Sequence, residues 1–335
     1  MDRDQIGLFA LGTSREFGLG VASALGLELG EHELRSFEDG EHKARPLESV
    51  RGRDVFVIHS LFGEPGATVN DKLCSLLFFI AGLRDAGAGV VTAVIPYLCY
   101  ARKDRKTKPR DPVTSRYVIE LLEAAGADRL LAFEVHNLAA LQNAARDGAD
   151  HLEARHLFVP RLAELIGDGD AVVVSPDPGG FKRADRTRED LEDVLGRPLP
   201  MAFVQKRRSA GVVEGETVVG DVAGKTAIVI DDLISSGGTL ARAARVLERA
   251  GAEEVVAAAA HGLFSGPASA ELAEPALGRI LVSSSVPPFR LEGEAAAKLE
   301  VVRAEPMFAD AIDRLHGGRS LTPLLEGWGT ARAMR

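Results

Sequence analysis

The sequence predicts an α/β protein with two tandem halves, each a mainly parallel sheet flanked by helices. Short apolar runs rich in β-branched residues alternate with amphipathic segments, as in proteins whose strands are buried on both faces. A strand–loop–helix–strand order occurs at residues 54–95 and recurs at residues 225–261. The length of 335 residues fits about two domains.

The composition limits the classes of protein to consider. A hydrophobic content of 46% is enough for real cores, and an aromatic share of 5% makes them mainly aliphatic. The net charge of −9 argues against a nucleic acid or an anionic membrane as a partner. Cys74 and Cys99 lie in apolar context and are expected to be reduced core residues. No secretory signal and no apolar run of membrane-spanning length are evident, so we expect a soluble, cytoplasmic protein.

The first half begins with a strand at Ile6–Leu11 and a helix that continues to Leu25. The segment Ser36–Glu41 follows and contains Asp39-Gly40, which is a turn signal. One interpretation is a hairpin tip with solvated charges. The other places Phe37 against a nucleobase, with Asp39 and Glu41 contacting the edge of the base or its ribose.

The next elements alternate as a parallel sheet requires. Asp54–Ile58 and Val90–Ile95 are predicted strands, and between them Asn70-Asp71 is a plausible cap for an amphipathic helix that ends near Gly87. A run rich in Lys and Arg, Tyr100–Arg110, follows the second of these strands. Such a run is usually solvated or mobile, but in an acidic chain it also suits a lid that closes over phosphates.

A helix at Tyr117–Ala127 and a strand at Arg129–Val135 then lead to His136. A lone histidine after a strand is more often structural than a ligand. The end of a strand nevertheless lies on the binding edge of an open α/β sheet, where a neutral imidazole suits a Mg²⁺–nucleotide complex.

The second half opens near Ala154 with a strand at Val172–Val174. It leads into the loop Ser175–Gly180, in which Gly179 and Gly180 suit an anion nest and Asp177 suits a cation. An ordinary Pro/Gly turn is the alternative. A strand that starts at Phe203 next ends in Lys206-Arg207-Arg208. Three cations leaving a strand suit a developing phosphate charge, although solvated charge explains them too.

The most informative run is Thr226–Thr239. Ala227–Ile230 is predicted to be a buried strand that ends in two adjacent carboxylates, Asp231 and Asp232. A loop of small residues precedes a helix, and its glycines let the backbone approach an anion. The loop residues that would form a phosphate cradle are Ser235, Ser236, Gly237, Gly238 and Thr239. The two carboxylates beside them suit sugar hydroxyls or Mg²⁺. A further strand, Val255–Ala260, and a last helix, Met307–Leu315, complete the pattern.

Several of these runs, in this order, resemble the motifs of ribose-phosphate pyrophosphokinases (phosphoribosyl pyrophosphate synthases) over roughly residues 35–325. The Asp-Asp…Gly-Gly-Thr run is similar to a loop that this family shares with phosphoribosyltransferases, but a simple transferase needs only one such half. The resemblance implies two tandem phosphoribosyltransferase-like domains, at residues 1–153 and 154–320, with a tail at residues 321–335.

The resemblance also implies a reaction and roles for residues. The reaction is transfer of a pyrophosphoryl group from MgATP to the 1-hydroxyl of ribose 5-phosphate, giving phosphoribosyl pyrophosphate and AMP. Lys206 and Arg208 would be catalytic, and Asp177, Gly179 and Gly180 would form the pyrophosphate loop. The implied ATP-binding residues are Phe37, Asp39, Glu41, Arg102, Lys103, Asp104, Arg105 and His136. Asp231, Asp232 and Ser235–Thr239 would bind ribose 5-phosphate.

His136 and Asp177 would assist the Mg²⁺ that accompanies ATP. Residues 105–110 would be a mobile loop. In the family a neighbouring subunit completes the nucleotide pocket, so a dimer-based homo-oligomer such as a hexamer is implied.

The chain departs from the family pattern at several positions. Ser235-Ser236 replaces Asp-Thr, Lys103 replaces Gln, Glu134 and Asn137 flank His136, and Ser283–Ser285 replaces Thr-Asn-Thr. These departures suggest a divergent member. They leave open a phosphoribosyltransferase that uses phosphoribosyl pyrophosphate, or a catalytically silent regulatory homologue.

Overall fold

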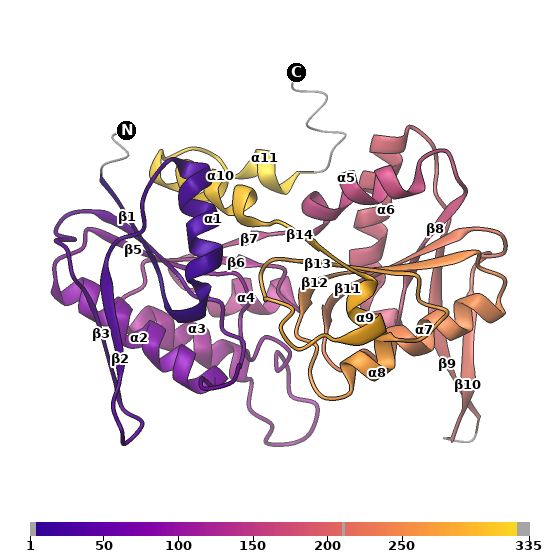
Figure 1. Ribbon diagram of the computed structural model, residues 1–335, viewed down its shortest axis with the longest axis horizontal. Helices are drawn as coiled ribbons and strands as arrows, with labels where there is room; N and C mark the ends of the chain where they lie inside the picture. The colour runs from indigo at the N-terminus through magenta and orange to yellow at the C-terminus, as the bar shows by residue number, and fades with distance from the viewer. Residues whose placement is uncertain (1–4, 210–211, 327–335) are drawn as a thin grey trace. The chain divides into compact units, whose positions relative to one another are not determined.

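The computed structural model describes residues 5–209 and 212–326, with side chains for all of these except 206–209 and 212–215. The chain forms two compact units, each an α/β structure with a mainly parallel sheet (Figure 1). Within the described ranges, the first unit contains residues 5–152 together with Ala304–Leu324, and the second contains residues 153–303 and 325–326. Within the described ranges, no helix combines the length and apolar character needed to span a membrane.

The first unit is built on a five-stranded parallel sheet in the order β1-β4-β5-β6-β7. Its strands are β1 (Ile6–Ala10), β4 (Asp54–Ile58), β5 (Val90–Ile95), β6 (Arg129–Phe133) and β7 (Ala149–Leu152). Its main helices are α1 (Arg15–Leu25), α2 (Val69–Asp85), α3 (Thr114–Ala124), α4 (Leu138–Ala144) and α10 (Glu305–His316). A separate antiparallel hairpin joins β2 (His32–Ser36) to β3 (His42–Pro46). The prediction of a parallel α/β sheet is therefore confirmed for this unit.

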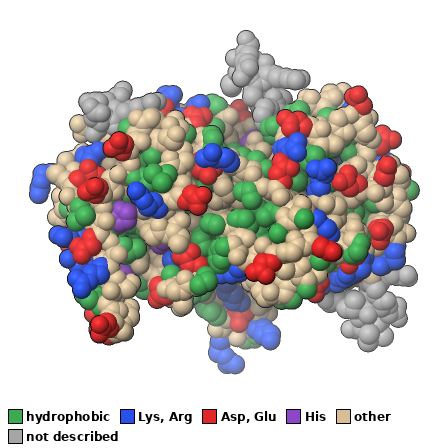
Figure 2. Space-filling view, in the orientation of Figure 1, with side chains coloured by type: hydrophobic (Ala, Val, Ile, Leu, Met, Phe, Trp, Pro, Cys, Tyr) green, Lys and Arg blue, Asp and Glu red, His purple; other side chains and the backbone are tan. Residues whose placement is uncertain are grey.

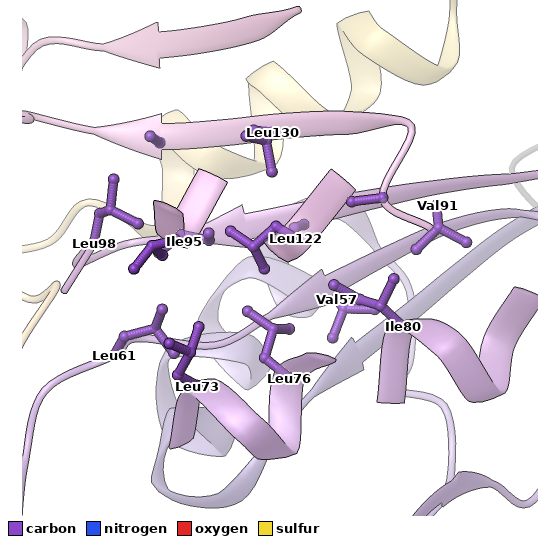
Figure 3. Packing of buried hydrophobic residues seen from close by; sticks show 14 of the residues in the cluster. Val57, Leu61, Leu73, Leu76, Ile80, Val91, Ile95, Leu98, Leu122 and Leu130 are labelled. Atoms are coloured by element: carbon purple, nitrogen blue, oxygen red, sulfur yellow. The ribbon is translucent and has the colours of Figure 1, made fainter. Parts of the chain in front are cut away.

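Both faces of this sheet are buried because side chains alternate across each strand. On one face, Val57 of β4 and Leu130 of β6 pack with Leu76 of α2 and Leu122 of α3 (Figure 3). On the other face, the ring of Phe308 in α10 lies 5.7 Å from that of Phe133 and 5.2 Å from that of Phe17 in α1. A strand buried on both faces reads as a continuous apolar run, which is why β4 and β5 have the predicted bounds.

The second unit is built on a seven-stranded sheet in the order β10-β9-β8-β11-β12-β13-β14. In the described part of this sheet, β9 and β10 pair antiparallel and the other neighbouring strands pair parallel. The strands are β8 (Ala171–Ser175), β9 (Met201–Ser209), β10 (Val212–Val219), β11 (Thr226–Ile234), β12 (Glu254–Gly262), β13 (Arg279–Ser283) and β14 (Leu299–Val302). The helices are α5 (Arg155–Ile166), α6 (Phe181–Leu195), α7 (Gly238–Arg249), α8 (Ala268–Leu272) and α9 (Gly293–Ala297).

Several helices begin or end at other residues than predicted. The helix expected at residues 117–127 is α3, which begins at Thr114 and ends at Ala124 before the left-handed Gly126. The cap of α2 is Thr68 rather than Asn70-Asp71. Its hydroxyl accepts from the Asp71 amide, and the Asp71 carboxylate accepts from the Thr68 amide, which is a complete capping box.

The helix α10, predicted as Met307–Leu315, lies in a different unit from the one that the sequence-based division gave it. That division placed residues 304–320 in the second domain, whereas α10 packs on α1 in the first unit. The extents 1–153, 154–320 and 321–335 remain a prediction about independent domains.

We expect Phe308→Ala to destabilise the first unit by about 3–5 kcal/mol, because removing a buried aromatic side chain leaves a cavity between α1, α10 and β6. Urea unfolding measures this change. The matched control is Phe78→Ala, at a ring that is 55% exposed on α2, where we expect about 1 kcal/mol or less. Equal losses in the two variants would contradict the packing described for α10.

Candidate functional site

The paired carboxylates of the second unit lie inside a strand rather than after it. β11 continues through Asp231 and Asp232 to Ile234, and Asp231 pairs in register with Ala259 of β12. The amide of Asp232 donates to Asp231 Oδ1 at 2.8 Å. Asp232 is buried, and its Oδ1 lies 3.9 Å from Nη1 of Arg183 on α6. The pair is thus fixed by the sheet.

The electrostatics of this pair are unfavourable in the ligand-free chain. Burial, followed by the charge of the Asp232 carboxylate, raises the pKa of Asp231 from 3.8 to about 8, and the charge of Arg183 opposes the shift. A group that donates hydrogen bonds to these oxygens, or a cation beside them, would favour the ionised form. Sugar hydroxyls and a divalent ion both fit this requirement.

The loop after β11 forms an open helix N-terminus. Gly237 is the N-cap of α7 with φ +81°, and no side chain caps the helix. A Cβ on Gly237 would lie 2.7 Å from Leu272 Cγ, so contact and backbone conformation both require glycine. The first turn of α7 contains no acidic residue. The amides at this end of the 12-residue helix can therefore bind an anion such as a phosphate.

The second predicted loop has a different local structure. Asp177 Oδ1 accepts from the amides of Gly179 and Gly180, at 2.7 and 3.0 Å, and so caps the short 3-10 turn Pro178–Gly180. The amides expected to form an anion nest are thus engaged by Asp177 itself. A pyrophosphate that used them would have to displace this carboxylate.

The predicted catalytic residues Lys206 and Arg208 lie in β9, and their side chains are outside the described part of the structure. The backbone still gives their position in the sheet. β9 pairs with β8 as far as Ser175↔Phe203 and then continues toward Ser209. Lys206 and Arg208 therefore follow the point where β8 ends, on the edge from which the Asp177 loop also leaves.

In the first unit, the segment that contains Phe37 is the tip of the β2–β3 hairpin. The Phe37 amide donates to Glu41 O at 2.7 Å, and the Glu41 amide donates to Asp39 Oδ1 at 3.1 Å. The Phe37 ring is 42% exposed, and the Arg35 guanidinium lies 5.2 Å from its centre. The segment is a hairpin tip, as Asp39-Gly40 indicates, and contact of Phe37 with a nucleobase stays a prediction. The tip presents an exposed aromatic ring and two carboxylates.

The basic run after β5 is organised around one carboxylate. Asp111 Oδ2 accepts from Lys103 Nζ at 2.7 Å, from the Thr107 hydroxyl at 2.7 Å, and from the amides of Thr107 and Lys108. These bonds hold the pKa of Asp111 below its usual range. Arg102 and Arg105 are exposed. Figure 2 shows Lys and Arg side chains gathered at the lower margin, where Figure 1 draws this loop.

The structure brings His136 close to the start of this basic loop through its neighbour Asn137. Asn137 Nδ2 donates to Asp104 Oδ2 at 2.6 Å, and Asn137 Oδ1 accepts from the Ala140 amide as the N-cap of α4. The Val135 amide donates to Nε2 of His151 on β7 at 3.0 Å. Glu134 has φ +39°, and its amide donates to Leu152 O. The segment that carries His136 is thus tied on three sides.

Two of the predicted nucleotide-binding segments lie apart within the first unit. In Figure 1 the β2–β3 hairpin tip and the loop after β5 are separate protrusions of the first unit. The predicted metal ligands His136 and Asp177 belong to different units. Among residues 5–209 and 212–326, no group of three or more His, Cys, Asp or Glu side chains is arranged to hold a metal ion.

Sequence reasoning missed three residues that support these segments. Arg183 approaches Asp232, Ser265 contacts Ser235, and His151 holds Val135. Arg183 closely follows the predicted loop Ser175–Gly180, and Ser265 closely follows the predicted strand Val255–Ala260, so their positions could have signalled a role. His151 follows an Asp in an ordinary edge strand and offered no such signal.

Comparisons with known proteins agree on one family. The model of the N-terminal domain of ribose phosphate pyrophosphokinase matches residues 6–126, and that of the phosphoribosyl synthetase-associated domain matches residues 198–326. Ribose-phosphate pyrophosphokinase 2 of Enterococcus faecalis is 37% identical over 322 residues, or 95% of each chain. The ribose-phosphate pyrophosphokinase of Caldanaerobacter subterraneus is 41% identical over 309 residues, or 91% of this chain and 92% of its own. The crystal structure of phosphoribosylpyrophosphate synthetase from Mycobacterium smegmatis has a TM-score of 0.84 and 36% identity, covering 93% of this chain and 99% of that one.

We expect Asp231→Asn to stabilise the ligand-free protein, and the gain to grow as the pH rises from 5 to 8. The pKa of this carboxyl group is higher in the folded chain than in the unfolded chain. The free energy of unfolding therefore falls as the pH rises above the pKa of the unfolded chain, because the folded protein must then either bind a proton at Asp231 or bury its charge. The amide removes this cost, which is about 1 kcal/mol or more at the upper end of the range.

Thermal unfolding of both proteins at the two pH values tests this expectation. Asp221→Asn is the matched control, because Asp221 pairs with Lys225 at 2.7 Å and its pKa is lowered rather than raised. Replacing Asp221 should therefore bring no gain at pH 8. A difference between Asp231→Asn and the unaltered protein that stays constant with pH would contradict the raised pKa.

Proposed function

The chain belongs to the ribose-phosphate pyrophosphokinase family, and from this premise we propose how its residues perform the reaction. The protein is a pyrophosphoryl transferase. It converts MgATP and ribose 5-phosphate to phosphoribosyl pyrophosphate and AMP. Both family models and nearly full-length relatives support this activity.

Our proposal starts from the edge of the second sheet where β11 ends. The observation that carries it is an uncapped helix N-terminus, opened by Gly237, that directly follows a strand with two adjacent carboxylates. The amides and hydroxyls of Ser235–Thr239 bind the 5-phosphate of the sugar. Asp231 and Asp232 accept hydrogen bonds from the ribose hydroxyls. Bonds of this kind favour the ionised form of Asp231 and thus offset its raised pKa.

The nucleotide is bound by residues of the first unit. Arg102, Lys103, Asp104 and Arg105 lie on the basic loop, and His136 is tied to that loop through Asn137 and Asp104. The exposed cations would contact phosphate oxygens. Lys103 is engaged with Asp111 in the ligand-free chain and would exchange that partner for a phosphate.

The transfer itself needs positioning and charge stabilisation more than covalent chemistry from the protein. The oxygen of the anomeric 1-hydroxyl attacks the β-phosphorus of ATP, and its proton passes to water. The bond from this phosphorus to the oxygen bridging the α- and β-phosphates breaks, and AMP leaves with that oxygen. Lys206 and Arg208 stabilise the charge of the transferred group, and Asp177, Gly179 and Gly180 contact it after the sugar is bound. Mg²⁺ bound to the phosphates, with His136 and Asp177 nearby, would neutralise part of the charge.

We also propose that the enzyme works as a dimer-based homo-oligomer. The Phe37 ring is exposed on a hairpin tip, and this tip and the basic loop of the same unit are separate protrusions. A neighbouring subunit would then supply Phe37, Asp39 and Glu41 to the nucleobase.

The free cysteines Cys74 and Cys99 suit a reducing compartment such as the cytoplasm.

We expect Lys206→Ala to lower turnover by at least a hundredfold and to leave the protein folded. One preorganised positive charge beside the transferred group typically accelerates such a reaction by about a hundredfold or more. The measurement is AMP formed from MgATP and ribose 5-phosphate, with a parallel reaction lacking the sugar phosphate to detect simple ATP hydrolysis. The matched control is Lys225→Ala, a lysine paired with Asp221 before the start of β11, which should retain activity. Near-normal turnover of Lys206→Ala would contradict the catalytic role.

A further inference from the structure

Two serine hydroxyls meet where the proposed sugar-phosphate loop begins. Ser235 is the first residue after β11, and Ser265 is the third residue after β12. Their Oγ atoms are 2.9 Å apart, and the Ser265 amide also donates to Ser235 O at 2.9 Å. Ser265 thus holds Ser235 through both backbone and side chain.

The surrounding backbone fixes this contact. β11 and β12 pair as far as Ile234↔Gly262, and the amides of Leu263 and Phe264 then both donate to Ile234 O. Phe264 has φ +45° and a buried ring that belongs to the core of the second unit. This turn brings Ser265 alongside Ser235. The position of Ser265 is therefore set by the core and does not depend on a ligand.

Either hydroxyl of the Ser235–Ser265 pair can donate the hydrogen bond, and a bound anion would decide which one does. A hydroxyl has one proton to donate and lone pairs that can accept. If Ser235 donates to an anion, its proton is used, and it can only accept from Ser265. An anion at the α7 N-terminus therefore selects one arrangement, in which Ser265 donates to Ser235 and Ser235 donates to the anion.

We propose that Ser265 is a positioning residue for ribose 5-phosphate, which orients the Ser235 hydroxyl toward the 5-phosphate without touching the substrate itself. This inference rests on the proposed role of Ser235 in the sugar-phosphate loop. The two serines carry no charge. Ser265 therefore contributes to the affinity for ribose 5-phosphate by aligning the Ser235 hydroxyl before the substrate binds.

Initial-rate kinetics on the full-length protein test the proposal with Ser265→Ala, Ser235→Ala and the double variant. We expect Ser265→Ala to raise the KM for ribose 5-phosphate roughly three- to tenfold, as for loss of one aligned hydrogen bond. The KM for MgATP and the kcat should each stay within about twofold. Ser265→Thr, which keeps the hydroxyl, should restore most of the affinity. In the Ser235→Ala background, Ser265→Ala should have no further effect, since its target is already absent.

The matched control is Ser269→Ala, on the same segment. Its hydroxyl contacts only Arg290 O and the Glu292 amide among the described residues, and the substitution should leave both KM values unchanged. Thermal unfolding checks that the variants are folded. Should Ser265→Ala not fold, Ser265→Cys carries the test, because a thiol of similar size is a weak donor and should also raise the KM for the sugar phosphate.

The outcomes separate this inference from the function on which it rests. If Ser235→Ala raises the KM for ribose 5-phosphate and Ser265→Ala does not, the positioning role is overturned and the sugar-phosphate loop stands. If neither variant changes that KM, Ser235 does not contact the phosphate and both assignments fail. An equal effect of Ser265→Ala with and without Ser235, or an equal rise in both KM values, would reduce Ser265 to a structural residue and overturn the proposal.

Discussion

The parallel pairing of β11 with β8 on one side and β12 on the other is the constraint on which the second unit depends. Val229 pairs with Val174 and Ile234 with Gly262, so the segments that leave these strands all start at one edge of the sheet. The strand amides and carbonyls are satisfied by the ladder, and both faces are apolar. Most polar residues therefore lie at or beyond that edge. Asp231 and Asp232 are an exception among the polar residues within the ladder, which also include His261 of β12 and Ser283 of β13, because they are two adjacent carboxylates that cannot move away from each other.

That exception has an electrostatic cost that suits a binding site. Two adjacent carboxylates in a largely buried strand disfavour ionisation of Asp231, and the guanidinium of Arg183 lies 3.9 Å from Asp232. Strongly shifted pKa values of this kind occur mainly at functional sites, where a bound ligand can stabilise the charged form. The open end of α7 has the complementary property, because its amides lack a capping side chain and its partial charge is positive. A sugar phosphate satisfies both, with hydroxyls for the acids and an anion for the helix.

Much of this arrangement could be predicted from the sequence, because it is encoded in local patterns. The strands at Asp54–Ile58 and Val90–Ile95 have the predicted bounds, since doubly buried strands are short apolar runs with polar ends. Residues 37–41 form the hairpin tip that Asp39-Gly40 signals. The helix predicted after the loop Ser235–Thr239 is also present, although it already begins at Gly238, inside the predicted loop. Contacts that no local pattern marks could not be predicted: Asp111 organises the basic loop, and His151 holds Val135. The cap of α2 is different, because Thr68 and Asp71 form a local capping box that the interpretation of the sequence overlooked. The roles of Lys206, Arg208 and the other proposed site residues remain predictions from motif and position.

The return of α10 to the first unit has a consequence for the order in which the protein can mature. A ribosome that has released residues 1–152 has made every strand of the five-stranded sheet, yet Phe17 and Phe133 still lack the ring of Phe308 that covers them. The intervening residues 153–303 must emerge before that cover arrives. The apolar surface around Phe17 and Phe133 therefore stays exposed throughout the synthesis of the second unit. A chaperone that binds exposed aromatic residues would protect the nascent chain during this period.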